Sequence, residues 1–278
     1  MNTEPVYIIK ADGTRELFDR TKLEDSLRRS GTNEKEILDI VSEVSDGMTP
    51  GMTSHDVYKQ AFGLLYKKNK PVALKYSLKR AVMELGPSGF PFEKFVAEIF
   101  NNMGFETLTG QTVKGFCVEH EVDVVAWNKE KLIMVEAKFH NQPGVKSDLK
   151  VALYVKARFE DLSKVTFNYG GKERKLDEGW LVTNTKFTTT AIEYGSCQGA
   201  LRMIGWNYPP EESLRDMIIK AKMHPLTCLS SLEGREKKEL LQRGIVLCKT
   251  VEENVEILED IGLTKEKIDK VLLEISLL

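Results

Sequence analysis

The stretch Gly86-Pro-Ser-Gly-Phe-Pro91 constrains the fold of this chain more than any other part of it. Two prolines and two glycines fall within six residues, a density that breaks helical and strand patterns. Apolar residues recur mainly at helical spacing before this stretch, whereas short β-like runs follow it. We therefore expect a change of architecture here and three regions, with bounds 1–87, 88–208 and 209–278.

The first region has the pattern of a hairpin followed by helices. Residues 6–9 and 16–19 read as two short strands around an Asp12-Gly13 turn, since Asp-Gly supplies the left-handed backbone that tight turns need. Ser54 and Asp56 resemble a helix start. Four helices are expected, around residues 23–27, 37–44, 57–65 and 71–85.

The second region alternates helices and strands. Its expected helices cover about 92–103, 147–162 and 188–195, and its expected strands cover 122–127, 132–137, 179–183 and 201–206. The stretch between the first two helices is β-rich, so we expect the α-β-β-β-α-β order of a mixed α/β domain. The third region contains amphipathic helical segments around 214–222, 235–243, 251–261 and 265–275. It has more acidic than basic residues, so dimerisation or lid formation is expected rather than DNA binding.

Composition narrows the location and the partners. The apolar runs are far shorter than the roughly 20 residues that a membrane-spanning helix needs, and the N-terminus lacks a secretion pattern, so we expect a cytoplasmic protein without a membrane span. Four scattered cysteines without a C-x-x-C pair indicate reduced, mostly buried thiols. A net charge of −2 means that any nucleic-acid surface depends on local segregation of charge.

Acidic residues at two neighbouring strands carry the chemistry. Asp123 lies in the first strand, and Glu136 and Lys138 end the second. Residues two apart on a strand face the same side, so Glu136 and Lys138 project together. Two carboxylates at strand ends offer a hard oxygen site suited to Mg²⁺, and an adjacent lysine can orient a water. These residues are equally compatible with solvated strand ends.

Asp123 followed by Glu136-Ala-Lys138 resembles the D…ExK signature of PD-(D/E)XK nucleases, particularly the Mrr-like and archaeal Holliday-junction-resolvase branches. The upstream pattern Phe92-Glu93-Lys-Phe-Val96…Gly104-Phe105 is similar to the helix that precedes it in this family. The resemblance implies a restriction-endonuclease-like fold in which Asp123 and Glu136 bind Mg²⁺ or Mn²⁺, with Lys138 and Glu93 as further catalytic residues. Glu98 is a second candidate for the helical carboxylate, and Glu119 or Glu121 could also enter the site.

Basic residues gather after this signature. Between Lys138 and Lys175 there are nine Lys or Arg against four Asp or Glu, so this segment could contact DNA phosphates. The candidates are Lys146, Lys150, Lys156 and Arg158, whereas Tyr154 and Phe159 are expected in the core. His140, Asn141 and Gln142 could position a water or the scissile phosphate, or could form a plain polar loop.

The N-terminal region resembles an ATP cone, the regulatory module of ribonucleotide reductases. The resemblance rests on Lys10-Ala-Asp-Gly13, Glu16, Phe18-Asp19, Lys22 and Leu27-Arg-Arg29, although Ala11 replaces the usual arginine. It implies that ATP or dATP binds at Lys10, Glu16, Asp19, Lys22 and Ser54. Lysines can neutralise phosphates, and a helix N-terminus offers free amides to an anion.

Together these patterns predict a nucleotide-regulated, Mg²⁺-dependent endonuclease that acts on DNA, comprising an ATP cone, a nuclease domain and a helical C-terminal region. Nucleotide binding would change its oligomeric state or domain placement, and a homo-oligomer is expected. The alternatives are a catalytically inactive, nucleotide-sensing DNA-binding regulator and a scaffold that only mediates assembly.

Overall fold

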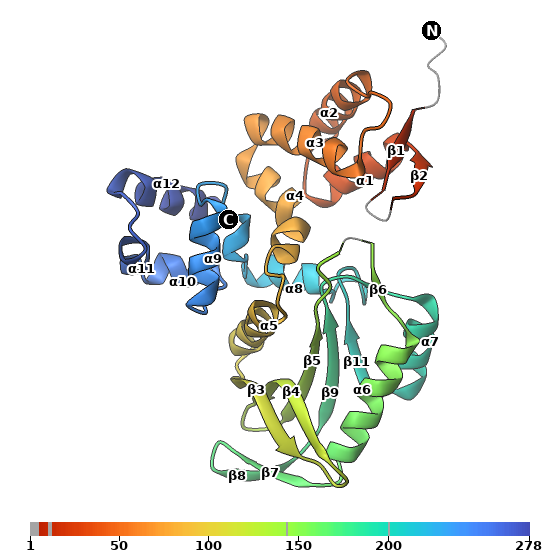
Figure 1. Ribbon diagram of the computed structural model, residues 1–278, viewed down its shortest axis with the longest axis vertical. Helices are drawn as coiled ribbons and strands as arrows, with labels where there is room; N and C mark the ends of the chain where they lie inside the picture. The colour runs from red at the N-terminus through yellow and green to blue at the C-terminus, as the bar shows by residue number, and fades with distance from the viewer. Residues whose placement is uncertain (1–5, 11–12, 143, 200) are drawn as a thin grey trace.

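In the computed structural model, which describes residues 6–10, 13–142, 144–199 and 201–278, a small helical region lies above a large sheet (Figure 1). The hairpin consists of antiparallel strands β1 (Tyr7–Ile9) and β2 (Arg15–Leu17). Asp12 of the expected turn lies outside the described residues. Four helices follow: α1 (Arg20–Arg29), α2 (Glu34–Asp46), α3 (Ser54–Lys68) and α4 (Lys70–Met83).

The start of α3 differs slightly from expectation. Thr53, not Ser54, caps this helix, because its hydroxyl accepts a hydrogen bond from the backbone N–H of Asp56. The Asp56 carboxylate accepts one from the backbone N–H of Thr53 in return. Such a reciprocal pair satisfies two amides at a helix start. Ser54 is thus the first helical residue.

Helix α4 belongs to two hydrophobic cores. Its Ala73 packs in the core of the N-terminal region, whereas Leu78 and Val82 pack in the core of the sheet. Helix α5 (Phe90–Asn102) begins inside the expected break, with Pro91 in the first turn. Proline is tolerated there because the first helical N–H groups have no partner within the helix. Six residues, 84–89, separate the two well-packed helices α4 and α5, so the break is a short corner.

A five-stranded mixed sheet forms the centre of the second region. Its order is β11-β9-β5-β4-β3, with β3, β4 and β5 antiparallel and β5, β9 and β11 parallel. The strands are β3 (Glu106–Lys114), β4 (Glu119–Trp127), β5 (Leu132–Lys138), β9 (Glu178–Thr183) and β11 (Leu201–Ile204). Helix α5 covers one face, and α6 (Leu149–Leu162) and α7 (Thr189–Gln198) cover the other.

Four short strands were not predicted from the sequence. Strands β6 (Lys146–Ser147) and β10 (Lys186–Phe187) form a parallel pair, and β7 (Thr166–Tyr169) and β8 (Lys172–Lys175) form a hairpin. A two-residue strand has no periodicity to detect, because alternation needs several residues. The expected mixed α/β fold with a restriction-endonuclease-like α-β-β-β-α-β order is nevertheless confirmed.

The C-terminal helices share the core on the α5 side of the sheet. They are α8 (Leu214–Ala221), α9 (Gly234–Gln242), α10 (Cys248–Glu253), α11 (Glu256–Asp260) and α12 (Lys265–Ile275), with a short 3₁₀ turn over Leu226–Cys228. The expected single helix over 251–261 is therefore wrong, because the chain breaks between α10 and α11. Dimerisation or lid formation by these helices stays a prediction.

Two smaller expectations concern the cysteines and the membrane. Cys228 and Cys248 are buried with their sulfur atoms 3.6 Å apart, but Cys117 and Cys197 are exposed. The expectation of mostly buried thiols thus holds for half of them. Within the described ranges, no helix has both the length and the apolar character required to cross a bilayer.

Candidate active site and nucleotide pocket

Asp123 lies where strands β4 and β5 stop pairing. Their ladder runs from Trp127 opposite Leu132 to Val124 opposite Val135. Beyond it, the backbone N–H of Ala137 donates to Oδ2 of Asp123 over 2.7 Å. The carboxylate therefore takes the place of a backbone acceptor, and this bond holds it beside β5.

Val135 and Ala137 pack in the core on the α5 side of the sheet. Because side chains alternate along a strand, Glu136 and Lys138 lie on the opposite face of β5, which α6 covers. Oε2 of Glu136 forms an ion pair with the guanidinium of Arg158 from α6. Arg158 is buried, and its guanidinium lies 4.7 Å from the ring centre of Tyr154. Lys138 is partly buried. Sequence reasoning missed the Arg158 contact, since nothing in a spacing of 22 residues indicates it.

The carboxylates are close enough to repel one another. The pKa of Asp123 is raised to about 7, first by desolvation and then by the negative charges of Glu136 and Glu93, against the opposing effects of the hydrogen bond from Ala137 and the charge of Arg158. Desolvation also raises the pKa of Glu93, helped by Glu121 and Glu136. We refer to Glu93, Asp123, Glu136 and Lys138 as the carboxylate site.

The competing acidic residues take different positions. Glu98 lies 3.7 Å from Lys94 and accepts a hydrogen bond from Asn101, so it is engaged along its own helix. Glu121 contributes charge near Glu93. Glu119 is an exposed residue at the start of β4. Of the two helical candidates, only Glu93 influences the pKa of Asp123.

The donor set suits a small divalent cation held by few protein ligands. No group of three or more His, Cys, Asp or Glu side chains with metal-binding geometry occurs in the described part of the chain. Mg²⁺ commonly binds through one or two carboxylates and several waters, so Asp123 and Glu136 suffice in number and chemistry. Their electrostatic repulsion is what a bound cation would relieve.

The loop after β5 is tied to its surroundings. Nε2 of His140 lies 2.9 Å from the hydroxyl of Ser147, so the ring is engaged with β6. The buried side chain of Asn184 binds both the backbone N–H and the carbonyl of His140, at 2.9 and 2.8 Å. Its amide also lies 3.0 Å from the sulfur of Met83 in α4. The carboxylate site is thereby linked to the N-terminal region through one buried amide.

Of the four basic residues expected to contact DNA phosphates, two are already engaged within the chain. Arg158 is buried against Glu136, and Lys156 pairs with Glu160 at 3.4 Å. Lys146 and Lys150 are exposed. Tyr154, expected in the core, has 57% of its surface exposed, whereas Phe159 is buried.

The structure brings all five expected nucleotide residues to one cavity of about 420 Å³, which we call the N-terminal pocket. In this pocket the carboxylate of Glu16 forms ion pairs with two lysines: Nζ of Lys10 lies 3.0 Å away, and Lys22 is also in contact. These lysines lower the pKa of Glu16. Residues that sequence reasoning did not select also line this pocket, notably Tyr58, Tyr76 and Lys79.

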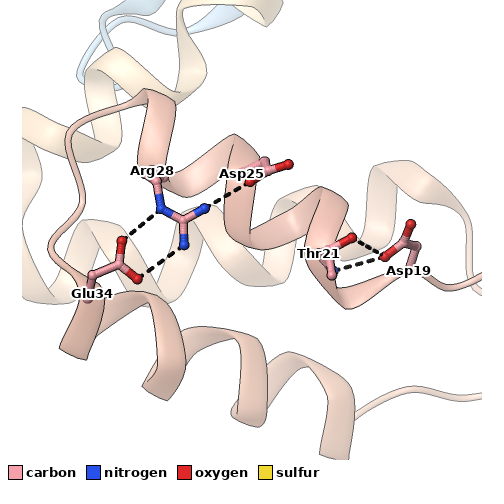
Figure 2. A network of polar contacts seen from close by, with 5 residues as sticks. All are labelled: Asp19, Thr21, Asp25, Arg28 and Glu34. Carbon is pink, nitrogen blue, oxygen red and sulfur yellow. Dashed lines mark hydrogen bonds and ion pairs between the residues drawn. The ribbon is translucent and has the colours of Figure 1, made fainter.

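The start of helix α1 lines this pocket, whereas Arg28 near its end does not. Asp19 caps the helix by accepting from the backbone N–H and the hydroxyl of Thr21, at 2.9 and 2.6 Å (Figure 2). Arg28 binds both carboxylate oxygens of Glu34 and one of Asp25 (Figure 2). The charge of Arg28 is therefore committed to neighbouring acids.

Three parts of the chain match known families in the expected order. Residues 6–83 match the ATP cone domain, residues 86–205 match the restriction endonuclease family of Mrr catalytic domains, and residues 224–278 match the AF1548-like C-terminal domain. The expected ATP cone and Mrr-like nuclease domains are thus confirmed. The described residues 6–10 and 13–83 include the N-terminal pocket, and the carboxylate site lies within 86–205.

Similar proteins extend this picture. An uncharacterised protein of Archaeoglobus fulgidus is 37% identical over 180 residues, which span 64% of this chain and 97% of that protein. The crystal structure of AF1548, a protein of unknown function, is 35% identical with a TM-score of 0.55, covering 68% of this chain and 97% of that chain. The MspJI restriction endonuclease with a 27-mer oligonucleotide is 15% identical over 76% of this chain and 44% of that one, and its TM-score of 0.32 supports no conclusion. The chain belongs to the AF1548-like family, with an ATP cone preceding its restriction endonuclease domain.

Proposed function

We propose that this protein is a Mg²⁺- or Mn²⁺-dependent endonuclease that hydrolyses DNA and is regulated by ATP or dATP bound to its ATP cone. The observation that carries this proposal is the convergence of Glu93, Asp123 and Glu136 where the pairing of β4 with β5 ends, within a restriction endonuclease domain. Lys138 follows two residues after Glu136 on the same strand face.

Asp123 and Glu136 would hold the cation. A bound Mg²⁺ lowers the pKa of a coordinated water and polarises a phosphodiester. Lys138 orients the attacking water and offsets negative charge that develops on the phosphate. The hydrogen bond from Ala137 fixes the Asp123 carboxylate, and Arg158 fixes that of Glu136. Glu93 would hold a water of the same site by hydrogen bonding.

Plasmid cleavage tests this proposal. Supercoiled DNA is incubated with Mg²⁺ or Mn²⁺, with and without ATP or dATP, using the wild type, Asp123→Ala and Lys138→Ala. We expect metal-dependent nicking that both substitutions abolish and that nucleotide changes. Cleavage that persists unchanged in both variants would contradict the proposed site.

One observation favours a second function, a catalytically inactive DNA-binding regulator that senses nucleotide. Arg158 already neutralises Glu136, and a buried ion pair is costly to open. For this function, no metal or nucleotide condition yields cleavage, while nucleotide changes the affinity for DNA in a gel-shift assay.

A further inference from the structure

A second cavity of about 540 Å³ lies between the ATP cone and the nuclease domain, and we call it the interdomain cavity. Side chains from α1, α3 and α4 line it on one side, and residues 144–146 and 185–186 line it on the other. Ser26, Ser54, Tyr58, Tyr76 and Lys79 line both this cavity and the N-terminal pocket. The two spaces therefore share a wall.

The charge of the interdomain cavity is one-sided. Lys79 and Arg80 come from α4, and Lys146 and Lys186 come from the paired strands β6 and β10. None of the described residues that line it is acidic. Arg80 pairs with Glu84 at 2.7 Å, but the three lysines have no ion-pair partner among the residues that the structure describes. Cations gathered without a counter-charge favour an anionic ligand.

The electrostatics of Lys79 support this interpretation. Its side chain is accessible from the cavity, yet surrounding protein atoms desolvate it and lower its pKa, and the positive charges of Lys186 and Arg29 lower the pKa further. The lysines of the N-terminal pocket differ, because Lys10 and Lys22 each form an ion pair with Glu16. The interdomain cavity is therefore the more favourable of the two cavities for an anionic group.

Aromatic side chains form part of the shared wall. The rings of Tyr58 and Tyr76 are nearly parallel at 13°, with centres 5.3 Å apart. Stacked aromatic side chains beside clustered cations suit a ligand with a base and several phosphates. The combination favours a nucleoside triphosphate over a simple anion.

We propose that one nucleoside triphosphate is shared by the two domains: it binds in the N-terminal pocket and extends its terminal phosphates past Lys79 to Lys146 and Lys186 of the nuclease domain. This inference rests on the proposed nucleotide binding and adds that the nuclease domain supplies part of the binding site. The ligand that the ATP cone binds would then be in direct contact with the domain that it regulates.

The two nuclease-domain lysines adjoin the network around the carboxylate site. Lys146 precedes Ser147, whose hydroxyl contacts His140 at 2.9 Å, two residues after Lys138. Lys186 follows the segment in which Thr183 and Thr185 contact each other at 3.3 Å and Asn184 binds His140. A phosphate held by Lys146 and Lys186 would therefore bind directly beside the segments that position the end of β5.

Titration calorimetry on the full chain tests the proposal, with ATP and AMP as probes and Mg²⁺ in constant excess. In Lys146→Gln/Lys186→Gln we expect the affinity for ATP to fall about tenfold or more, since two charged phosphate contacts are lost, and that for AMP to change less than about twofold. The matched control is Lys172→Gln/Lys175→Gln, which removes two exposed lysines of β8 at the far end of the sheet (Figure 1). This control should bind ATP like the wild type.

The opposing outcomes are distinct. Unchanged ATP affinity in Lys146→Gln/Lys186→Gln would overturn the shared site and leave the proposed function intact. If the affinity of this variant for DNA fell at the same time, the two lysines would be DNA contacts instead. An equal loss for ATP and AMP would also overturn the shared site, because the lysines would not then recognise terminal phosphates. A wild type that binds no ATP would overturn the shared site and the proposed regulation by ATP, whereas the nuclease activity is decided separately by plasmid cleavage. Thermal unfolding of each variant verifies that it is folded.

Discussion

The carboxylate site and the N-terminal pocket handle charge in opposite ways. In the carboxylate site, partly buried acids repel one another, and the pKa of Asp123 rises to about 7. In the N-terminal pocket, Lys10 and Lys22 surround Glu16 and lower its pKa. The first site is short of positive charge, whereas the second is balanced before any ligand arrives.

This difference indicates two kinds of ligand exchange. A cation entering the carboxylate site relieves repulsion, so its binding should also stabilise the fold. An anion entering the N-terminal pocket must compete with Glu16 for lysines that are largely solvent-accessible, so its binding should be readily reversible and sensitive to salt. These properties would suit a carboxylate site that keeps its cation and an N-terminal pocket that exchanges its ligand.

The largest expected effect comes from Asp123→Asn. We expect the rate of DNA cleavage to fall about a thousandfold or more, because the proposed metal site would lose one of its two carboxylate ligands. The melting temperature in EDTA should rise, because the variant removes a repelled carboxylate, and added Mg²⁺ should no longer raise it. Glu119→Gln, an exposed change on the same strand, should behave as the wild type. If the metal-free Asp123→Asn protein were no more stable than the wild type, repulsion among the acids of the carboxylate site would not destabilise the fold, which would contradict the comparison.

A smaller effect is expected at the helical carboxylate. Glu93→Gln should lower the cleavage rate about 10- to 100-fold, because Glu93 lies within electrostatic reach of Asp123. Glu98→Gln on the same helix should leave the rate unchanged, since Glu98 interacts with Lys94 and Asn101. Initial rates at saturating Mg²⁺ measure both. The reverse order of effects would show that Glu98 is the functional residue.

In the N-terminal pocket, Lys22→Gln should weaken ATP binding about tenfold, because one charged phosphate contact is lost. Arg28→Gln is its matched control on the same helix. Glu34 and Asp25 already engage Arg28, so its loss should leave ATP affinity within about twofold of the wild type. Calorimetric titration distinguishes the two variants, and equal losses would mean that α1 acts only through its net charge.

His224 belongs to neither site and should affect neither ligand. Burial lowers its pKa from 6.5 to about 4, so the unfolded chain takes up a proton first as the pH falls. Stability is therefore lost from about pH 6.5 down toward pH 4, by about 3 kcal/mol. Denaturant unfolding at several pH values measures this slope, and His224→Leu should flatten it. An undiminished slope in that variant would assign the effect to other groups.

Much of the fold follows from local patterns. Long periodic segments such as α2 and α12 are readily predicted, because one apolar face repeats over several turns. The restriction-endonuclease-like order of helices and strands was predictable for the same reason. Strands β6 and β10 were not, since each has two residues and acquires its partner only through folding. The division of residues 251–261 into two helices likewise left no clear signal.

The carboxylate site was predictable as a set of residues but not as an environment. Asp123, Glu136 and Lys138 are conspicuous in the sequence, and alternation along a strand places the last two on one side. The distant contact of Arg158 with Glu136 depends on how α6 packs against β5. A basic residue on a helix is usually solvated, so its burial could be learned only from the structure.

The sequence by itself determined the order of the domains, the residue types of both sites and the strand face shared by Glu136 and Lys138. Local propensities and side-chain periodicity are sufficient for these, because they act between neighbouring residues. Only the tertiary structure decided that α4 joins two cores, and that Lys79 comes to lie beside Lys186. Such proximity arises from packing between distant segments, which leaves no trace in local spacing.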